Sequence, residues 1–162
     1  MDKIIEIIMG KVLHSLHIKI ENNKFKGLIQ FISFGVIGIS NTIIGYLLNI
    51  IVIIILKPYF VSWDYIVANM IAFLIGVLWS FYWNNKYVFV ITDGHERNLG
   101  IALLKTYISY GFTGIILNNL LSYIWIYIFG VSKMIAPLIN MIISVPINFL
   151  INKLWAFKAS NS

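Results

Sequence analysis

The stretch that decides the fold is LIQFISFGVIGISNTIIGYLLNIIVIIIL, residues 28–56, which contains no Lys, Arg, Asp or Glu. A helix needs about 20 apolar residues to cross the hydrocarbon core of a bilayer. The run is longer than that, so it predicts a membrane span that tilts or protrudes at one end. Lys57 and Pro58 end it, because proline removes a backbone donor that the next helical turn needs.

Further apolar runs follow this first span. The predicted spans are residues 28–56, 65–83, 104–129 and 134–151, with a polar loop from residue 84 to about 103 and a turn at 130–133. The whole chain of 162 residues is 60% hydrophobic and 11% charged. Soluble domains are roughly 45–50% apolar and about 25% charged. The composition therefore excludes a soluble enzyme and predicts an all-α membrane protein with four transmembrane helices.

The segment before the first span is different in character. Residues 2–20 alternate charged residues with Ile and Leu, which is typical of an amphipathic helix lying on the membrane surface. Residues 21–27, ENNKFKG, read as a short polar break. The predicted organisation is thus a surface helix and linker over 1–27, a four-span domain over 28–158, and a tail over 159–162.

Basic residues gather on one side of this topology, which sets the predicted orientation. One side holds ten of the 12 basic residues: Lys3, Lys11, Lys19, Lys24, Lys26, Lys86, Arg97, Lys105, Lys153 and Lys158. Lys57 and Lys133 are on the other side. Because basic loops stay in the cytoplasm, both termini are predicted to be cytoplasmic.

The second half of the chain repeats the first. FISFGVIG (31–38) matches YISYGFTG (107–114), and NNKYVF (84–89) matches NKLWAF (152–157). Every fourth residue is small or polar in both later spans: Ala68, Ala72, Gly76, Ser80 and Asn84 in one, Ala136, Asn140, Ser144, Asn148 and Asn152 in the other. The chain is therefore predicted to hold two parallel copies of one helical hairpin, an arrangement that transporters use. Such rows are more often packing seams than substrate paths.

At these residues the chain resembles the GtrA-like family, over roughly residues 25–158. The resemblance rests on the Phe- and Gly-rich first span that leads into Ser40-Asn41-Thr42, and on the motifs Asn84-x-x-Tyr87-Val88-Phe89 and Asn152-x-x-Trp155-Ala156-Phe157. In one departure, Lys86 stands one place later after Asn84 than Lys153 does after Asn152. In another, Ile43-Ile44-Gly45 lacks the acidic residue that often follows the family's Asn-Thr.

The resemblance implies a flippase, or a partner of one, for a polyprenyl-phosphate-linked sugar such as undecaprenyl phosphate-glucose. Such a lipid carries a phosphate that needs cations at headgroup depth and a sugar that needs hydrogen bonds inside the bilayer. The predicted phosphate ligands are Lys86, Lys153 and Lys105. The predicted polar lining is Asn41, Asn84, Asn118, Asn140, Asn148 and Asn152, and the predicted sugar-stacking rings are Tyr87, Trp155 and Trp83. Membrane anchoring, helix-to-helix bonds and interfacial aromatic residues remain the structural alternatives for these three sets.

Two other functions compete with this one. A non-transporting subunit that docks a glycosyltransferase is the main alternative. A small multidrug or cation exporter is disfavoured, because such a protein is expected to carry an intramembrane carboxylate and none of the predicted spans contains one away from its edge. No nucleophile–base pair, metal-ligand cluster or phosphate loop stands out, so we expect no catalysis, no cofactor, no metal and no nucleic-acid partner. A four-span monomer encloses little volume, which favours a homodimer.

Overall fold

The structure is a computed structural model that describes residues 22–59, 64–91, 97–132 and 134–158, together with residues 4, 5, 7, 8, 10 and 11. Those six N-terminal residues are helical, whereas residues 12–21 of the predicted surface helix and linker, and the tail 159–162, lie outside the described residues. The chain divides into two compact units, Met1–Val90 and Ile91–Ser162. Each unit is a helical hairpin, as the sequence repeat predicts.

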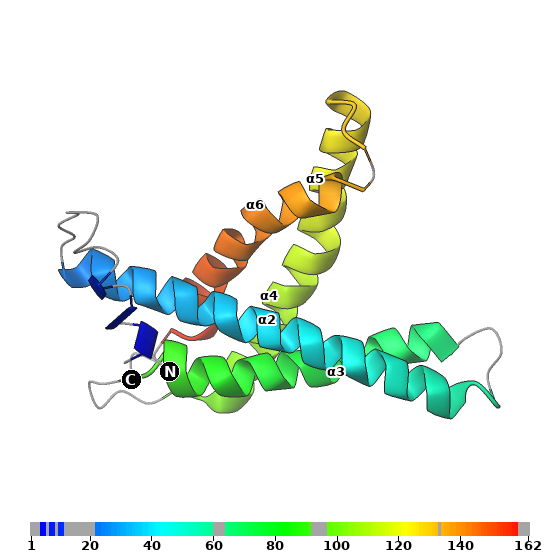
Figure 1. Cartoon of the computed structure of the whole chain (residues 1–162). Helices are drawn as coiled ribbons and strands as arrows, with labels where there is room; N and C mark the ends of the chain where they lie inside the picture. Colours follow the sequence, from blue (N-terminus) through cyan, green and yellow to red (C-terminus); the bar gives the residue numbers. More distant parts are fainter. Residues whose placement is uncertain are drawn as a thin grey trace. The chain divides into compact units, whose positions relative to one another are not determined.

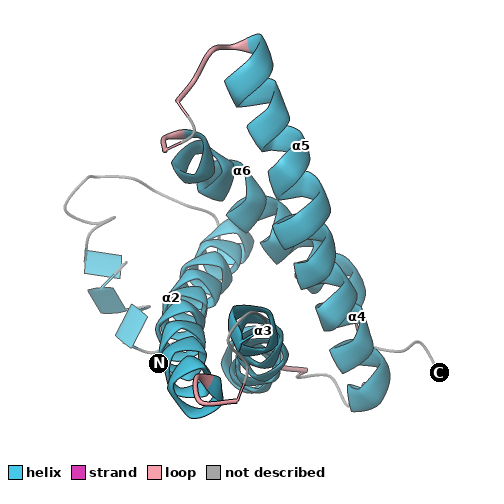
Figure 2. Cartoon of the chain, turned by 90° about the vertical axis from the view of Figure 1, so that its right-hand side faces the viewer, coloured by secondary structure: helices cyan, strands magenta, loops and turns pink. Residues whose placement is uncertain are grey.

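The first hairpin consists of α2 (Asn22–Leu56) and α3 (Asp64–Trp83), which run side by side in both views (Figures 1 and 2). A π-helical turn, η1 (Asn84–Val88), continues α3 directly. The two long helices are antiparallel, because bonds between them join Asn49 to Asn69 near one end and Ser40 to Trp79 further along.

The second hairpin pairs two composite helices, seen as the yellow-green and orange ribbons of Figure 1. The first is built from α4 (Leu99–Gly111), η2 (Phe112–Leu117), α5 (Asn118–Tyr123) and η3 (Ile124–Ile128); the second is built from α6 (Ala136–Ile151) and η4 (Asn152–Ala156). Gly130 has a φ of 67° and turns the chain between them, a left-handed conformation that glycine adopts without steric cost. Gly130 lies in the turn predicted at residues 130–133, of which Lys133 is outside the described residues.

Four helical stretches of the described chain are long and apolar enough to cross a membrane: Asn23–Leu56, Ile66–Val88, Leu99–Ile128 and Ala136–Ala156. Helices and their connections make up all that is described, with no strand among those residues (Figure 2). The predicted fold class is therefore confirmed. The chain is a multi-pass membrane protein.

Most large apolar side chains of the described helices are exposed, and many of the buried residues are small or polar, unlike in a soluble domain. Ile39 is 66% exposed on α2, whereas Ala68, Ser80 and Ala136 are fully buried against the facing helix. Small residues let helix backbones approach closely in lipid, where no hydrophobic effect drives the helices together. The small-residue rows are therefore the packing seams of the two hairpins.

The helix ends differ from the predicted span limits in physically informative ways. The helix that contains the first predicted span, α2, begins at Asn22 and has 35 residues, so it is about 50 Å long and exceeds the roughly 30 Å hydrocarbon core. The helix that contains the third predicted span begins at Leu99, because the Asn98 side chain accepts a hydrogen bond from the Ile101 amide and caps the helix. The predicted polar loop after residue 84 is also shortened by η1.

Candidate functional site

The two repeated motifs form the same local structure. In both, the asparagine begins a π-helical turn: the Phe89 amide donates to the Asn84 carbonyl at 2.9 Å, and the Phe157 amide donates to the Asn152 carbonyl at 2.8 Å. Such turns hold one residue more than an α-helical turn and are frequent at functional sites. The two motifs therefore form the same π-helical turn at the ends of the second and fourth membrane helices.

Each motif asparagine is fully buried and bonded through its amide nitrogen. Asn84 donates to the Ser80 hydroxyl at 3.0 Å. Asn152 donates to the Ser109 hydroxyl at 3.0 Å and to the Asn148 side-chain oxygen at 2.9 Å, and the Ser109 hydroxyl donates to that same oxygen. Neither asparagine acts as a simple cap at the end of its helix. Asn152 instead ties η4 to α4 across the second hairpin, whereas the bond from Asn84 to Ser80 lies within its own helix.

Deeper in the second hairpin, Asn140 joins α6 to α5. Its amide nitrogen donates to the Ser122 hydroxyl at 2.7 Å and to the side chain of Asn118. In the first hairpin the corresponding depth holds Asn41, whose oxygen approaches Gly76 closely. All six predicted lining asparagines therefore lie on helices that form the two hairpins, and all six side chains are wholly or partly sheltered.

Several of these amides keep an acceptor unused. The side-chain oxygens of Asn41, Asn84, Asn140 and Asn152 are buried and accept no hydrogen bond from any described residue. A buried acceptor without a donor costs about 1–3 kcal/mol. The hairpin seams thus hold acceptor atoms that a hydroxyl group would satisfy.

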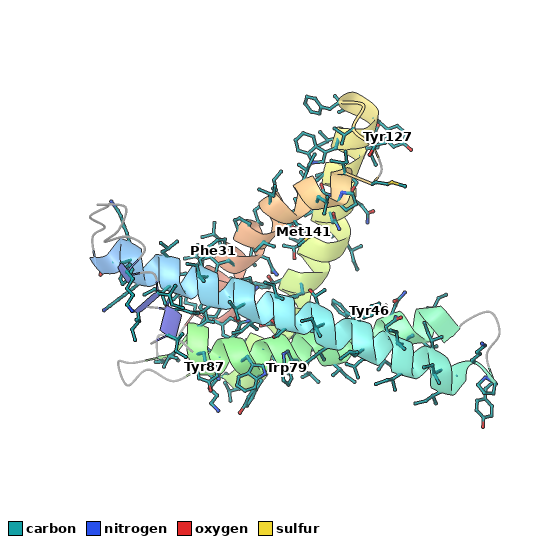
Figure 3. The ribbon with its side chains drawn as sticks, in the orientation of Figure 1. Phe31, Tyr46, Trp79, Tyr87, Tyr127 and Met141 are labelled. Atoms are coloured by element: carbon teal, nitrogen blue, oxygen red, sulfur yellow. The ribbon has the colours of Figure 1, made fainter. Side chains whose placement is uncertain are left out.

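Lys86 stands among aromatic rings at the end of the first hairpin. Its ammonium lies 5.6 Å from the ring centres of Tyr82 and Trp83, 5.4 Å from that of Tyr87, and donates to the Tyr82 hydroxyl at 3.4 Å. Trp83 and Tyr87 stack on each other, with planes 8° apart. Figure 3 shows Tyr87 and Trp79 projecting from this same α3–η1 helix. Trp83 and Tyr87, two of the predicted sugar-stacking residues, therefore each cover one face of the other's ring.

The other predicted cations and the third predicted ring belong to the second hairpin. Lys105 donates to the Trp155 carbonyl at 3.5 Å, and its ammonium lies 5.5 Å from the centre of the Trp155 ring. The ammonium of Lys153 lies 5.5 Å from the Phe149 ring centre. Lys105 and Lys153 thus share a unit, while Lys86 belongs to the other unit.

A pocket of about 200 Å³ opens beside Lys105 and gathers two cations that the sequence did not single out as ligands, Arg97 and Lys158. The rest of its wall is formed by Asn98, Ile101, Ala102 and Ala156. Arg97 donates to the Phe157 carbonyl, and its guanidinium carbon lies 5.1 Å from the Phe157 ring centre. Burial lowers the pKa of the Arg97 guanidinium, because desolvation disfavours its charged form.

Sequence reasoning missed Arg97 and Lys158 because both read as ordinary positive-inside residues. Arg97 precedes α4 and Lys158 follows η4, so they are distant in the chain and meet only when the second hairpin closes. Only their positions could have indicated a shared role, because each residue lies immediately outside a helix end, on the side of the membrane predicted to hold most of the basic residues.

Two repeated hairpins, apolar outside and amide-bearing inside, define the chain as a small integral membrane protein built by duplication. It matches the family model described as GtrA/DPMS, transmembrane domain, over residues 33–157, and the chain belongs to this family. It is also similar to the cell wall teichoic acid glycosylation protein GtcA of Listeria monocytogenes, with 30% identity over 105 residues, which is 64% of this chain and 70% of that protein. No solved structure matches the chain.

Proposed function

We propose that the protein flips a polyprenyl-phosphate-linked monosaccharide, undecaprenyl phosphate-glucose or a close analogue, from the cytoplasmic to the outer leaflet. There the sugar serves glycosylation of a cell-surface polymer. Family membership and the similarity to a teichoic acid glycosylation protein support this role. A flipped lipid of this kind keeps its tail in the bilayer, so the protein needs to shelter only the sugar and the phosphate.

The observation that carries the proposal is the set of buried, unused amide oxygens on the hairpin seams. Asn84, Asn140 and Asn152 each bury a side-chain oxygen that no described donor reaches. In hydrocarbon, each sugar hydroxyl without a partner costs several kcal/mol. Amide oxygens accept from hydroxyls, and the neighbouring serines both donate and accept. When the seams part during transport, these groups replace water around the sugar.

The remaining predicted lining residues extend the polar seam of their own hairpin, Asn41 in the first and Asn118 and Asn148 in the second. At the membrane edge of each hairpin, Lys86 in the first and Lys105 and Lys153 in the second supply positive charge that attracts the anionic lipid. The exposed parts of the Trp83, Tyr87 and Trp155 rings stack on the sugar. Both termini are in the cytoplasm of a bacterial cell, so the cations face the leaflet where the lipid-linked sugar is made. We further propose a homodimer that works beside a membrane glycosyltransferase.

The test is purified full chain in liposomes that contain undecaprenyl phosphate-glucose, with the outward-facing sugar measured over time by an impermeant reagent. The protein is expected to speed the appearance of sugar from the inner leaflet well beyond that in protein-free vesicles. A phosphatidylcholine probe in the same vesicles is the control for leakage or general scrambling. No acceleration, together with stable co-purification with a glycosyltransferase, would instead establish the non-transporting subunit.

A further inference from the structure

The pocket at the base of the second hairpin is built by three cations from two chain segments. Arg97 lies just before α4, Lys105 lies on α4, and Lys158 lies just after η4. None of the pocket's lining residues, all within the described chain, is acidic. The pocket therefore concentrates positive charge at the helix ends, which is where headgroups meet a spanning helix.

Two of the three cations are held in place by the backbone of the repeated motif. Arg97 donates to the Phe157 carbonyl and lies over its ring, and Lys105 donates to the Trp155 carbonyl. Carbonyls at a helix C-terminus carry partial negative charge and suit such donors. Because these bonds fix two of the long side chains in advance, an anion that binds between them loses less side-chain entropy than it would at a flexible surface.

A comparison of the two hairpins shows that the three cations are not needed to form the repeated fold. The first hairpin forms the same π-helical turn, yet the residues at the positions corresponding to Arg97, Lys105 and Lys158 are Glu21, Ile29 and Val90. The π-helical turn thus forms in the first hairpin without these three cations. Their presence in one copy alone indicates a task that only the second hairpin performs.

We propose that Arg97, Lys105 and Lys158 form the site that binds the phosphate of the lipid-linked sugar. The volume of about 200 Å³ is below the roughly 300–1,000 Å³ of pockets that enclose a whole drug-sized ligand, so it accepts the phosphate and part of the sugar while the tail stays in lipid. An anion there also offsets the desolvation of the Arg97 guanidinium. This inference rests on the proposed function and assigns its phosphate to one hairpin.

The test is a binding titration of the full chain in detergent by native mass spectrometry. The probes are undecaprenyl phosphate-glucose, undecaprenol, inorganic phosphate and phosphatidylglycerol. Arg97→Gln, Lys105→Gln and Lys158→Gln are each expected to weaken binding of the sugar lipid about tenfold, as loss of one charge-assisted contact does. Lys26→Gln, which removes the same charge from an exposed position outside the pocket, is expected to leave binding unchanged.

Each outcome decides the proposal. Weaker binding in the pocket variants, with undecaprenol and phosphatidylglycerol binding poorly to wild type, supports it. Equal binding of phosphatidylglycerol shows a general lipid anchor and overturns it, as does equal affinity for inorganic phosphate alone. If Arg97→Gln fails to fold, the exposed Lys158→Gln carries the test. Loss of binding in Lys86→Gln and Lys153→Gln, but not in the pocket variants, also overturns it.

The same variants in the liposome assay separate this inference from the function it rests on. If wild-type protein binds the lipid through the pocket but does not exchange it between leaflets, the phosphate-site proposal stands and the flippase proposal is contradicted. If wild-type protein exchanges the lipid and the Lys105→Gln and Lys158→Gln variants are equally active, the flippase proposal stands and the phosphate-site proposal is contradicted.

Discussion

Asn41 and Gly76 face each other across the first hairpin, and their contact makes a prediction at the scale of single residues. A Cβ placed on Gly76 would lie 2.7 Å from the Asn41 side-chain oxygen, too close for a normal contact. Gly76→Ala is therefore expected to force Asn41 to rotate, whereas in an Asn41→Ala background the same change meets open space. The coupling free energy in a double-mutant cycle should be about 1 kcal/mol, measured by unfolding in detergent.

Gly38→Ala is the matched control, because a Cβ there has no atom within 4 Å. Gly38 lies on α2, the helix that also carries Asn41, but an added Cβ there does not reach the Asn41 side chain, so Gly38→Ala should show no coupling to Asn41→Ala. Additive effects of Gly76→Ala and Asn41→Ala would mean that the two residues do not touch in the folded protein.

Asn152 gives a second prediction at this scale. Its amide nitrogen bonds to Ser109 and Asn148, and all of its surface is buried, so Asn152→Ala removes buried hydrogen bonds and leaves the Ser109 hydroxyl with one partner fewer. The expected loss of unfolding free energy is about 1–3 kcal/mol. Asn119→Ala serves for comparison, because that exposed amide bonds within its own helix and should change stability much less. Equal losses in the two variants would contradict this bonding pattern.

The sequence indicated asparagines that would sit on the helix contacts, but it did not indicate the cationic pocket that Arg97 and Lys158 complete. Asparagine in an apolar span needs a partner, so its burial at a helix contact follows from local chemistry. Arg97 and Lys158 carry no such mark, because a cation beside a membrane helix is ordinary. Their meeting depends on the tertiary closure of two segments, and no periodicity within either segment reports it.

At the scale of elements, the π-helical turn η4 is tested by removing one residue from it. Deleting Leu154, which is 66% exposed, removes the extra residue that distinguishes a π turn from an α turn. The residues that remain then close an α-helical turn, which keeps the Phe157 amide on the Asn152 carbonyl but shifts the residues between them, so the Trp155 carbonyl moves away from Lys105. The variant is expected to melt at a lower temperature than wild type and to bind undecaprenyl phosphate-glucose more weakly.

Leu154→Ala controls for the loss of the side chain, because it keeps the chain length and changes only an exposed group. Its stability and binding should match wild type. A deletion variant that behaves like Leu154→Ala would show that the π geometry is not needed to place the residues within the turn.

The number and order of the membrane helices were predictable, and their ends were not. Apolar length alone identifies a span. The π turns at residues 84–88 and 152–156 contain lysine and asparagine, which hydropathy assigns to loops although the backbone continues to coil. The cap at Asn98 likewise starts a helix among residues that precede the apolar run. Helix ends therefore depend on hydrogen-bond geometry that averaged hydropathy does not contain.

The topology of the whole molecule is open to a direct prediction, because the chain contains no cysteine. Single cysteines introduced at Tyr59 and Ser132, in the two turns predicted to be outside, should react with an impermeant thiol reagent added to intact cells. A cysteine at Asn98 should react only after the membrane is opened. Labelling of Asn98→Cys in intact cells would reverse the predicted orientation and place the cationic pocket on the wrong side for its substrate.

The central claim is that the molecule moves a sugar-bearing lipid between leaflets, and the most direct measurement is how much of that lipid becomes accessible from outside. Liposomes with undecaprenyl phosphate-glucose in both leaflets are prepared at increasing ratios of protein to vesicle. Without protein, only the outer-leaflet lipid should be accessible. We predict that accessibility rises towards all of the lipid once each vesicle holds active protein. Accessibility that stays at the outer-leaflet level, with the protein folded and inserted, would contradict the claim.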